Sequence, residues 1–167
     1  MRDISWKLEN PHKITEAELA ALEERFSFQI PEELRQFCLQ HNGGLLPTGT
    51  EIDQERCKLT DFLAIKYPLM ESIPIMDTLL EWQKMDGFIP MYYIPFCNDE
   101  AGDSYYIRVD EAGYGKVYYI FSEFLDDFLD DPEEEGLIAG SFAEFLEMIH
   151  FPESDDPAVN GFPADSI

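Results

Sequence analysis

The chain has 167 residues, of which 45% are hydrophobic and 14% aromatic, a length and composition that suit one folded domain without disulfide staples. Its 35 acidic residues outnumber its 11 basic residues, giving a formal net charge of −24. Such a surface repels phosphate groups, so we expect no direct binding to nucleic acid or to anionic membranes. It favours a basic protein partner, although acidity that serves only solubility is the alternative.

The lengths of the apolar runs and the spacing of the cysteines predict where in the cell the protein is found. No run of 18 apolar residues is present, and the opening residues lack the apolar stretch of a signal peptide. Cys38, Cys57 and Cys97 are widely spaced and form no C-x-x-C pair, which argues against a disulfide framework and against a zinc site. We therefore expect a cytoplasmic protein with no membrane span, no metal and no cofactor.

Two amphipathic helices are predicted first. Thr15 to Glu18 is a capping box that begins a helix running to Phe26. Pro31 suits the first turn of a second helix, and the segment Asn42-Gly43-Gly44 is expected to end it through a left-handed glycine. The second helix has an apolar stripe made of Leu34, Phe37, Cys38 and His41.

The middle of the chain is expected to hold a loop, a strand and a third helix. Residues 45–58 contain proline, glycine and mixed charges and are predicted as a loop. Residues 59–65 alternate as a strand does. Ser72 is predicted to cap a helix that runs to about Met85.

Strands are predicted to follow the third helix. Residues 92–96 are predicted to form a strand. Because Pro95 has no amide hydrogen to donate, we expect either that this strand lies at a sheet edge or that Pro95 lies at the end of the strand. Residues 104–109 and 116–121 are rich in β-forming side chains and flank a glycine-containing loop, which predicts a hairpin.

Two more helices are predicted before the C-terminal tail. Ser122 is expected to cap a helix that turns Phe124, Leu125, Phe128 and Leu129 inward, and residues 141–144 form a second capping box. The order of elements predicts an α+β fold rather than an alternating βαβ fold. We expect one domain over residues 1–151 and a loosely attached acidic tail, containing prolines, over residues 152–167.

Acidic residues gather near the C-terminus. The last basic residue is Lys116, and the 51 residues after it contain 14 acids and no base. The densest stretch, residues 123–135, is either an ordinary solvated face or a surface whose self-repulsion a basic partner relieves. This repulsion also predicts that added salt stabilises the isolated protein.

The sequence offers no catalytic constellation. His12, His41 and His150 match no metal-ligand spacing, and the glycine patterns of nucleotide loops and nucleophile elbows are missing. Residues 98–103 faintly resemble a calcium loop but fail the EF-hand spacing, so a tight turn between two strands is favoured.

Several segments together resemble the SUKH superfamily, specifically its Smi–Knr branch. An acidic helix precedes a short link, a proline and a helix that ends in Asn42-Gly43-Gly44. The later segments of the resemblance are Ile94-Pro95-Phe96, residues 99–103, Tyr105-Tyr106-Ile107, residues 115–118 and residues 141–146. The resemblance covers roughly residues 14 to 149 and implies an α+β domain with a curved, mostly antiparallel sheet and helices packed around it.

The resemblance also implies a function. Bacterial members look like non-enzymatic immunity proteins that bind and neutralise toxin domains, many of them nucleases, so we expect a basic toxin domain as the partner. A regulatory scaffold that binds several proteins through the acidic tail is the main alternative, and a calcium or small-molecule sensor is a weaker one. The expected binding surface combines an exposed aromatic anchor, Tyr114, with the acidic residues Asp99, Glu100, Asp103, Glu123, Asp126, Asp127, Asp130, Asp131 and Glu134.

Overall fold

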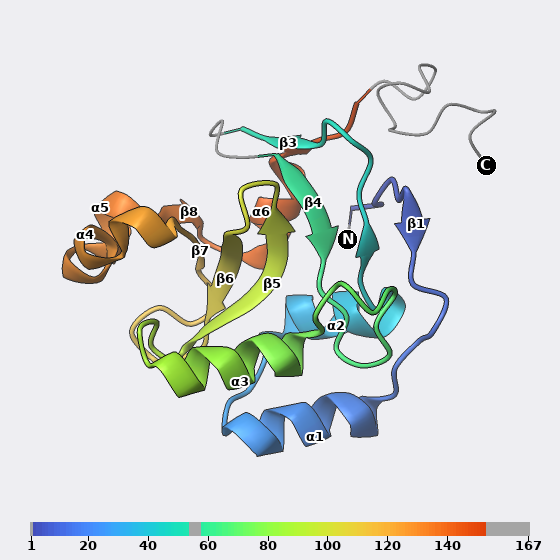
Figure 1. The fold of residues 1–167 in the computed structure, drawn as a ribbon, viewed down its shortest axis with the longest axis horizontal. Coiled ribbons are helices and arrows are strands. Elements are labelled where there is room, and N and C mark those ends of the chain that lie inside the picture. Colours follow the sequence, from blue (N-terminus) through green and yellow to red (C-terminus); the bar gives the residue numbers. More distant parts are fainter. Residues whose placement is uncertain (1, 54–57, 153–167) are drawn as a thin grey trace.

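A computed structural model describes residues 2–53 and 58–152 of the chain (Figure 1). Cys57 and all of the predicted tail beyond Pro152 lie outside the described residues. Among the helices of the described part, none is long and apolar enough to cross a membrane.

Seven strands form an antiparallel sheet with the order β1-β2-β4-β5-β6-β7-β8 (Figure 1). They are β1 (Leu8–Glu9), β2 (Gly44–Leu45), β4 (Leu59–Phe62), β5 (Tyr93–Asp99), β6 (Ser104–Arg108), β7 (Val117–Ile120) and β8 (Leu137–Ala139). A separate ribbon pairs β3 (Glu51–Ile52) with β9 (Ile149–His150). The sheet and its helices form one α+β domain, as predicted.

Six α-helices and one 3₁₀ turn surround this sheet within the described residues. They are α1 (Glu16–Phe26), α2 (Glu32–Gln40), α3 (Met76–Asp86), the 3₁₀ turn η1 (Ser122–Phe124), α4 (Leu125–Asp130), α5 (Pro132–Glu135) and α6 (Phe142–Glu147). Helices α4 and α5 lie together beyond β8, at the opposite end of the molecule from β1 (Figure 1).

The two faces of the sheet belong to two apolar clusters. In β6, Tyr105 and Ile107 join the main core with residues of α1, α2, α3 and α6. Tyr106, between them in the chain, points to the other face and joins a smaller cluster with Tyr93, Tyr118, Ile120 and Phe128. Alternating side chains thus bury both faces of the hairpin, and the smaller cluster supports α4.

The local signals at two helix starts are confirmed to different degrees. Thr15 accepts a hydrogen bond from the Glu18 amide at 3.1 Å and donates its own amide to the Glu18 carboxylate at 3.0 Å, so the first capping box is complete. Ser141 accepts from the Glu144 amide at 3.1 Å, but the Glu144 carboxylate accepts instead from the Gly140 amide at 3.2 Å. The second box is therefore only half formed.

The glycines after α2 have a different role from the predicted helix cap. Helix α2 ends at Gln40, and its cap residue His41 is extended. Gly43 has φ +74°, and a side chain there would bring Cβ within 2.7 Å of the Phe62 carbonyl oxygen. The glycines therefore permit a close approach to the segment at β4, where β2 pairs.

Three further predictions in this half of the chain are corrected. Residues 45–58 were expected to be a loop, but β2 begins at Gly44 and β3 pairs with β9. Helix α3 begins at Met76 after an Ile75 cap rather than at Ser72. Pro74 disfavours the helical conformation of the residue before it, Ile73, which would have been the first residue of the predicted helix. Strand β5 lies between β4 and β6 rather than at an edge, and Pro95 lies inside this strand rather than at its end. A register shift between Pro95 and Cys97 accommodates the missing amide.

The predicted fourth helix is broken into three short pieces. The segment from Ser122 forms the turn η1 without a side-chain cap, and Pro132 begins α5. Phe128 is buried, but Phe124 is 58% exposed and Leu129 38% exposed, against the inward orientation expected for both. A helix of two turns contacts the sheet along one narrow face, which leaves the flanking apolar residues outside.

Candidate functional site

The acidic arm, defined as α4 and α5 (residues 125–135), contains seven acidic residues and no lysine or arginine. The side chains of Asp126, Asp127 and Asp130 are exposed, as is Glu123 in the preceding turn. None of these four has a cationic partner within residues 2–53 and 58–152. Most carboxylates of the predicted acidic stretch are therefore exposed, and these four are not neutralised within the described residues.

Phe128 attaches the arm to the sheet. Its ring lies 5.3 Å from the Tyr93 ring and 5.9 Å from the Tyr118 ring, both in edge-to-face geometry. Gly136 makes this packing possible, because a Cβ there would lie 2.5 Å from Phe128 Cε1. The arm is thus held by one buried ring with a glycine against it.

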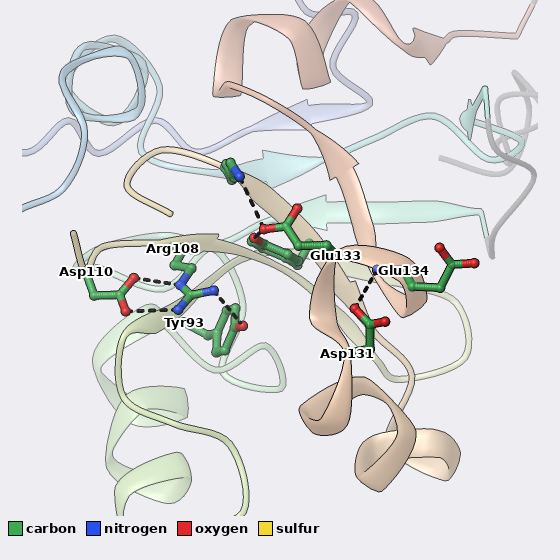
Figure 2. Close-up of polar contacts among 8 residues, drawn as sticks. Tyr93, Arg108, Asp110, Asp131, Glu133 and Glu134 are labelled. Atoms are coloured by element: carbon green, nitrogen blue, oxygen red, sulfur yellow. Dashed lines mark hydrogen bonds and ion pairs between the residues drawn. The ribbon is translucent and has the colours of Figure 1, made fainter. Parts of the chain in front are cut away.

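Glu133 makes the polar attachment. Its Oε1 accepts from the Tyr118 hydroxyl at 2.9 Å and from Lys116 Nζ at 3.2 Å. The Tyr118 hydrogen bond, followed by Lys116, lowers the pKa of Glu133. Figure 2 shows Glu133 pointing toward the sheet, so this carboxylate is already bound by Tyr118 and Lys116 of the same chain.

Two predicted site residues on α5 differ in their availability. Asp131 accepts from the Glu134 amide at 3.3 Å and is the N-cap of α5 (Figure 2). The Glu134 side chain is exposed, and no base of the described chain pairs with it. Asp131 therefore serves the helix first, whereas Glu134 is free to contact a partner.

The turn between β5 and β6 contains a structural aspartate. Asp99 is 4% exposed, and its carboxylate accepts the Ala101 and Asp103 amides and the Tyr119 hydroxyl at 2.5 Å. This burial does not fit the partner-contact role expected for Asp99. It also leaves the calcium alternative without a free ligand at that position, and the structure confirms a tight turn between two strands.

The rest of the turn lies next to the start of the arm. Glu100 is exposed, and Asp103 accepts the Ser122 amide at 3.3 Å. Ser122 opens η1, so this contact joins the turn to the segment that leads into α4.

Tyr114 is exposed, as predicted, but it belongs to another part of the surface. Its ring is 49% exposed, and its hydroxyl donates to the Gln29 carbonyl at 3.0 Å. It lines a cavity of about 590 Å³ with residues such as Phe28 and Glu111, between the α1–α2 link and the hairpin loop. The expected anchor therefore makes no contact with the acidic arm.

Most basic side chains are already paired with acids away from the arm. The pairs are Lys13–Glu9, Arg25–Asp77, Arg25–Glu81, Arg35–Glu23, Lys58–Glu51, Lys66–Glu18 and Arg108–Asp110. In the last pair, two guanidinium nitrogens of Arg108 donate to Asp110 at 2.6 and 3.0 Å and lower the Asp110 pKa (Figure 2). These bases are committed elsewhere, so little positive charge is left to neutralise the arm.

Two histidines of the described chain contact carboxylates, and the Cys38 thiol is buried. His41 Nδ1 lies 2.7 Å from Glu9 Oε2, and His150 contacts Asp53 at the surface. No cluster of three histidine, cysteine or carboxylate side chains suited to a metal ion occurs in the described residues. Burial raises the pKa of the Cys38 thiol to about 12, which makes it a core residue and not a nucleophile.

Three apolar residues at the C-terminal end of α3 are exposed, although they were not predicted to be surface residues. Trp82 is 51% exposed, Met85 78% and Phe88 67%. The buried side of α3 carries Met76 and Leu80. Helical spacing places Trp82 and Met85 off that stripe, which is the signal that could have identified them.

Comparison with known proteins identifies a family. Among curated proteins, none matches this chain. Residues 13–148, which include the arm, the turn and the whole sheet except β1, match the family model described as SMI1 / KNR4 family (SUKH-1). The chain therefore belongs to the SMI1/KNR4 family.

Proposed function

We propose that this protein is a non-enzymatic immunity protein that binds and neutralises a basic toxin domain. The observation that carries the proposal is a set of exposed carboxylates on and beside the acidic arm that have no cationic partner within the described chain, namely Glu123, Asp126, Asp127, Asp130 and Glu134. Family membership supports a protein-binding role, since the resemblance seen in the sequence points to toxin inhibition.

The charge of the arm suits a basic target physically. Nuclease domains carry basic surfaces that bind phosphate, and an acidic protein can occupy such a surface. Complementary fields also accelerate encounter, which benefits an inhibitor that must act before the toxin does. The proposed contact residues are Glu123, Asp126, Asp127, Asp130 and Glu134, with Glu100 and Asp103 of the neighbouring turn.

The proposal is tested with the toxin domain encoded beside this gene. The variant Asp126→Lys with Asp130→Lys reverses two exposed carboxylates without removing the Asp131 cap or the Glu133 contacts. We expect its association rate at low salt to fall about tenfold, with a smaller change in dissociation, because exposed charges act mainly on encounter. The matched control Glu71→Lys with Glu147→Lys makes the same change of charge at exposed sites outside the arm.

Two outcomes would overturn the proposal. If the protein neither binds nor inhibits any neighbouring toxin domain, the proposed function is wrong. If the two variants associate at equal rates, the acidic arm is not the binding surface. The regulatory-scaffold alternative is separated by deleting residues 152–167, which abolishes binding under that alternative and spares it under ours.

A further inference from the structure

A groove lies between the C-terminal end of α3 and the η1–α4 segment. It has a volume of about 330 Å³. Leu79 and Trp82 of α3 line it together with Leu125 of α4, and Tyr106 of β6 and Ser122 contribute to its lining. Its walls are therefore largely apolar, and it adjoins the acidic arm through Leu125.

Two carboxylates lie in or beside this groove. Asp86 lines it, and Asp103 lies between two further lining residues, Gly102 and Ser104. Burial raises the pKa of the Tyr106 hydroxyl to about 12, and the charges of Asp103 and Asp86 add to this rise. Both carboxylates therefore bear on the same phenol within the groove.

Neither carboxylate is neutralised by the described part of the chain. Asp86 accepts the Phe88 amide at 3.0 Å, and Asp103 accepts the Ser122 amide at 3.3 Å. Lys84 is exposed and forms no ion pair with Asp86 or with Asp103. The groove therefore combines apolar walls with two carboxylates that have no cationic partner in the described residues, an environment that attracts a cationic group.

We propose that this groove receives a lysine or arginine side chain from the basic protein partner. Such a side chain places its aliphatic stem along Leu79 and Leu125 and its charged head beside Asp86 and Asp103. The exposed face of Trp82 adds a cation–π contact, for which tryptophan is the best aromatic partner. A purely apolar side chain would pack against the apolar walls of the groove, but it would leave both carboxylates unpaired and less hydrated.

This inference rests on the proposed function for the identity of the partner, but its test does not use the toxin. The probe is the capped tripeptide acetyl-Leu-Arg-Leu-amide, titrated into the ¹⁵N-labelled full chain. The matched control peptide carries citrulline, which has nearly the shape of arginine but no charge. We expect saturable shifts at the Trp82 indole and at the Ser104 and Tyr106 amides.

Variants locate the binding within the chain. Asp86→Asn with Asp103→Asn retains an oxygen that can accept the Phe88 and Ser122 amides while removing both charges. We expect it to weaken arginine-peptide binding about fivefold, as the loss of two partly exposed charge contacts implies. The control Glu71→Gln with Glu147→Gln removes the same charge outside the groove and should bind as the parent does.

The outcomes separate this inference from the proposed function. Three results would overturn the proposal that the groove binds a basic side chain. They are equal binding of the arginine and citrulline peptides, shifts spread evenly over the acidic surface, and equal weakening of binding by both pairs of substitutions. A toxin that is inhibited while the peptide leaves the groove unshifted would refute the groove alone. Peptide binding in the groove without inhibition of any neighbouring toxin would refute the proposed function alone.

Discussion

Replacing Phe128 with alanine should loosen the acidic arm more than any other single change in it. The ring is 2% exposed and packs edge-to-face against Tyr93 and Tyr118. Truncation of a well-packed phenylalanine costs about 3–5 kcal/mol. We expect about 3 kcal/mol here, because the smaller cluster lies beneath short helices that can partly collapse into the space.

Two measurements check this expectation. For a chain of this length, a loss of 3 kcal/mol lowers the melting temperature by roughly 6–12 °C. Hydrogen exchange should show the loss of protection in α4, α5 and β8, while β4 to β6 stay protected. The second measurement matters because the arm can open locally without unfolding the main core.

A neighbouring substitution is the control. Leu129 lies on the same helix but is 38% exposed, so Leu129→Ala should cost less than about 1 kcal/mol and leave arm exchange nearly unchanged. If Phe128→Ala unfolds within 1 kcal/mol of the parent and exchanges like it, Phe128 does not attach the arm.

Three further predictions concern Gly136, the unpaired acids of the arm and Glu18. Gly136→Ala should destabilise by about 1–3 kcal/mol in a denaturant titration, because its Cβ would lie 2.5 Å from Phe128 and 2.7 Å from the Tyr119 carbonyl. Gly140→Ala should be nearly neutral, because its Cβ would meet only the carboxylate end of the Glu144 side chain, at 3.3 Å. The melting temperature should rise between low salt and about 0.5 M sodium chloride, because the unpaired acids of the arm repel one another; a fall would mean that attractive pairs dominate. The Tyr67 hydroxyl and the Thr15 amide lower the pKa of Glu18 from 4.5 to about 2, so its contribution to stability is present above pH 4.5 and is lost as the pH falls toward 2. Glu18→Gln should therefore flatten the pH dependence of the melting temperature below pH 4.5, and an unchanged slope would refute this account.

Short-range chemistry made much of the fold predictable. The first capping box joins residues three apart, and the hairpin of β6 and β7 closes over a short loop, so both are encoded in neighbouring residues. The strands β1, β2 and β3 have two residues each and depend on distant partners. Their sequences carry no alternation long enough to reveal them, which is why residues 45–58 were predicted as a loop.

Single-sequence reasoning identified the acidic arm but not its internal divisions. Exposure of Asp126 and Asp130 follows from their charge alone. The burial of Asp99 depends on Tyr119, which lies 20 residues further along and reaches it only because β6 and β7 pair. The groove beside Trp82 likewise needs α3 and η1 to be placed together, which no local pattern specifies.

The geometry of the arm suggests how the protein tolerates so much like charge. Glu133, which faces the sheet, is matched by Lys116 and by the Tyr118 hydroxyl, and Asp131 is matched by an amide of α5. Asp126 and Asp130 are exposed, so water and salt screen them. The arm thus spends its few internal donors on the carboxylates that fix its position. Repulsion is left among the outward carboxylates, and a cationic surface can relieve it without displacing any contact that holds the arm in place.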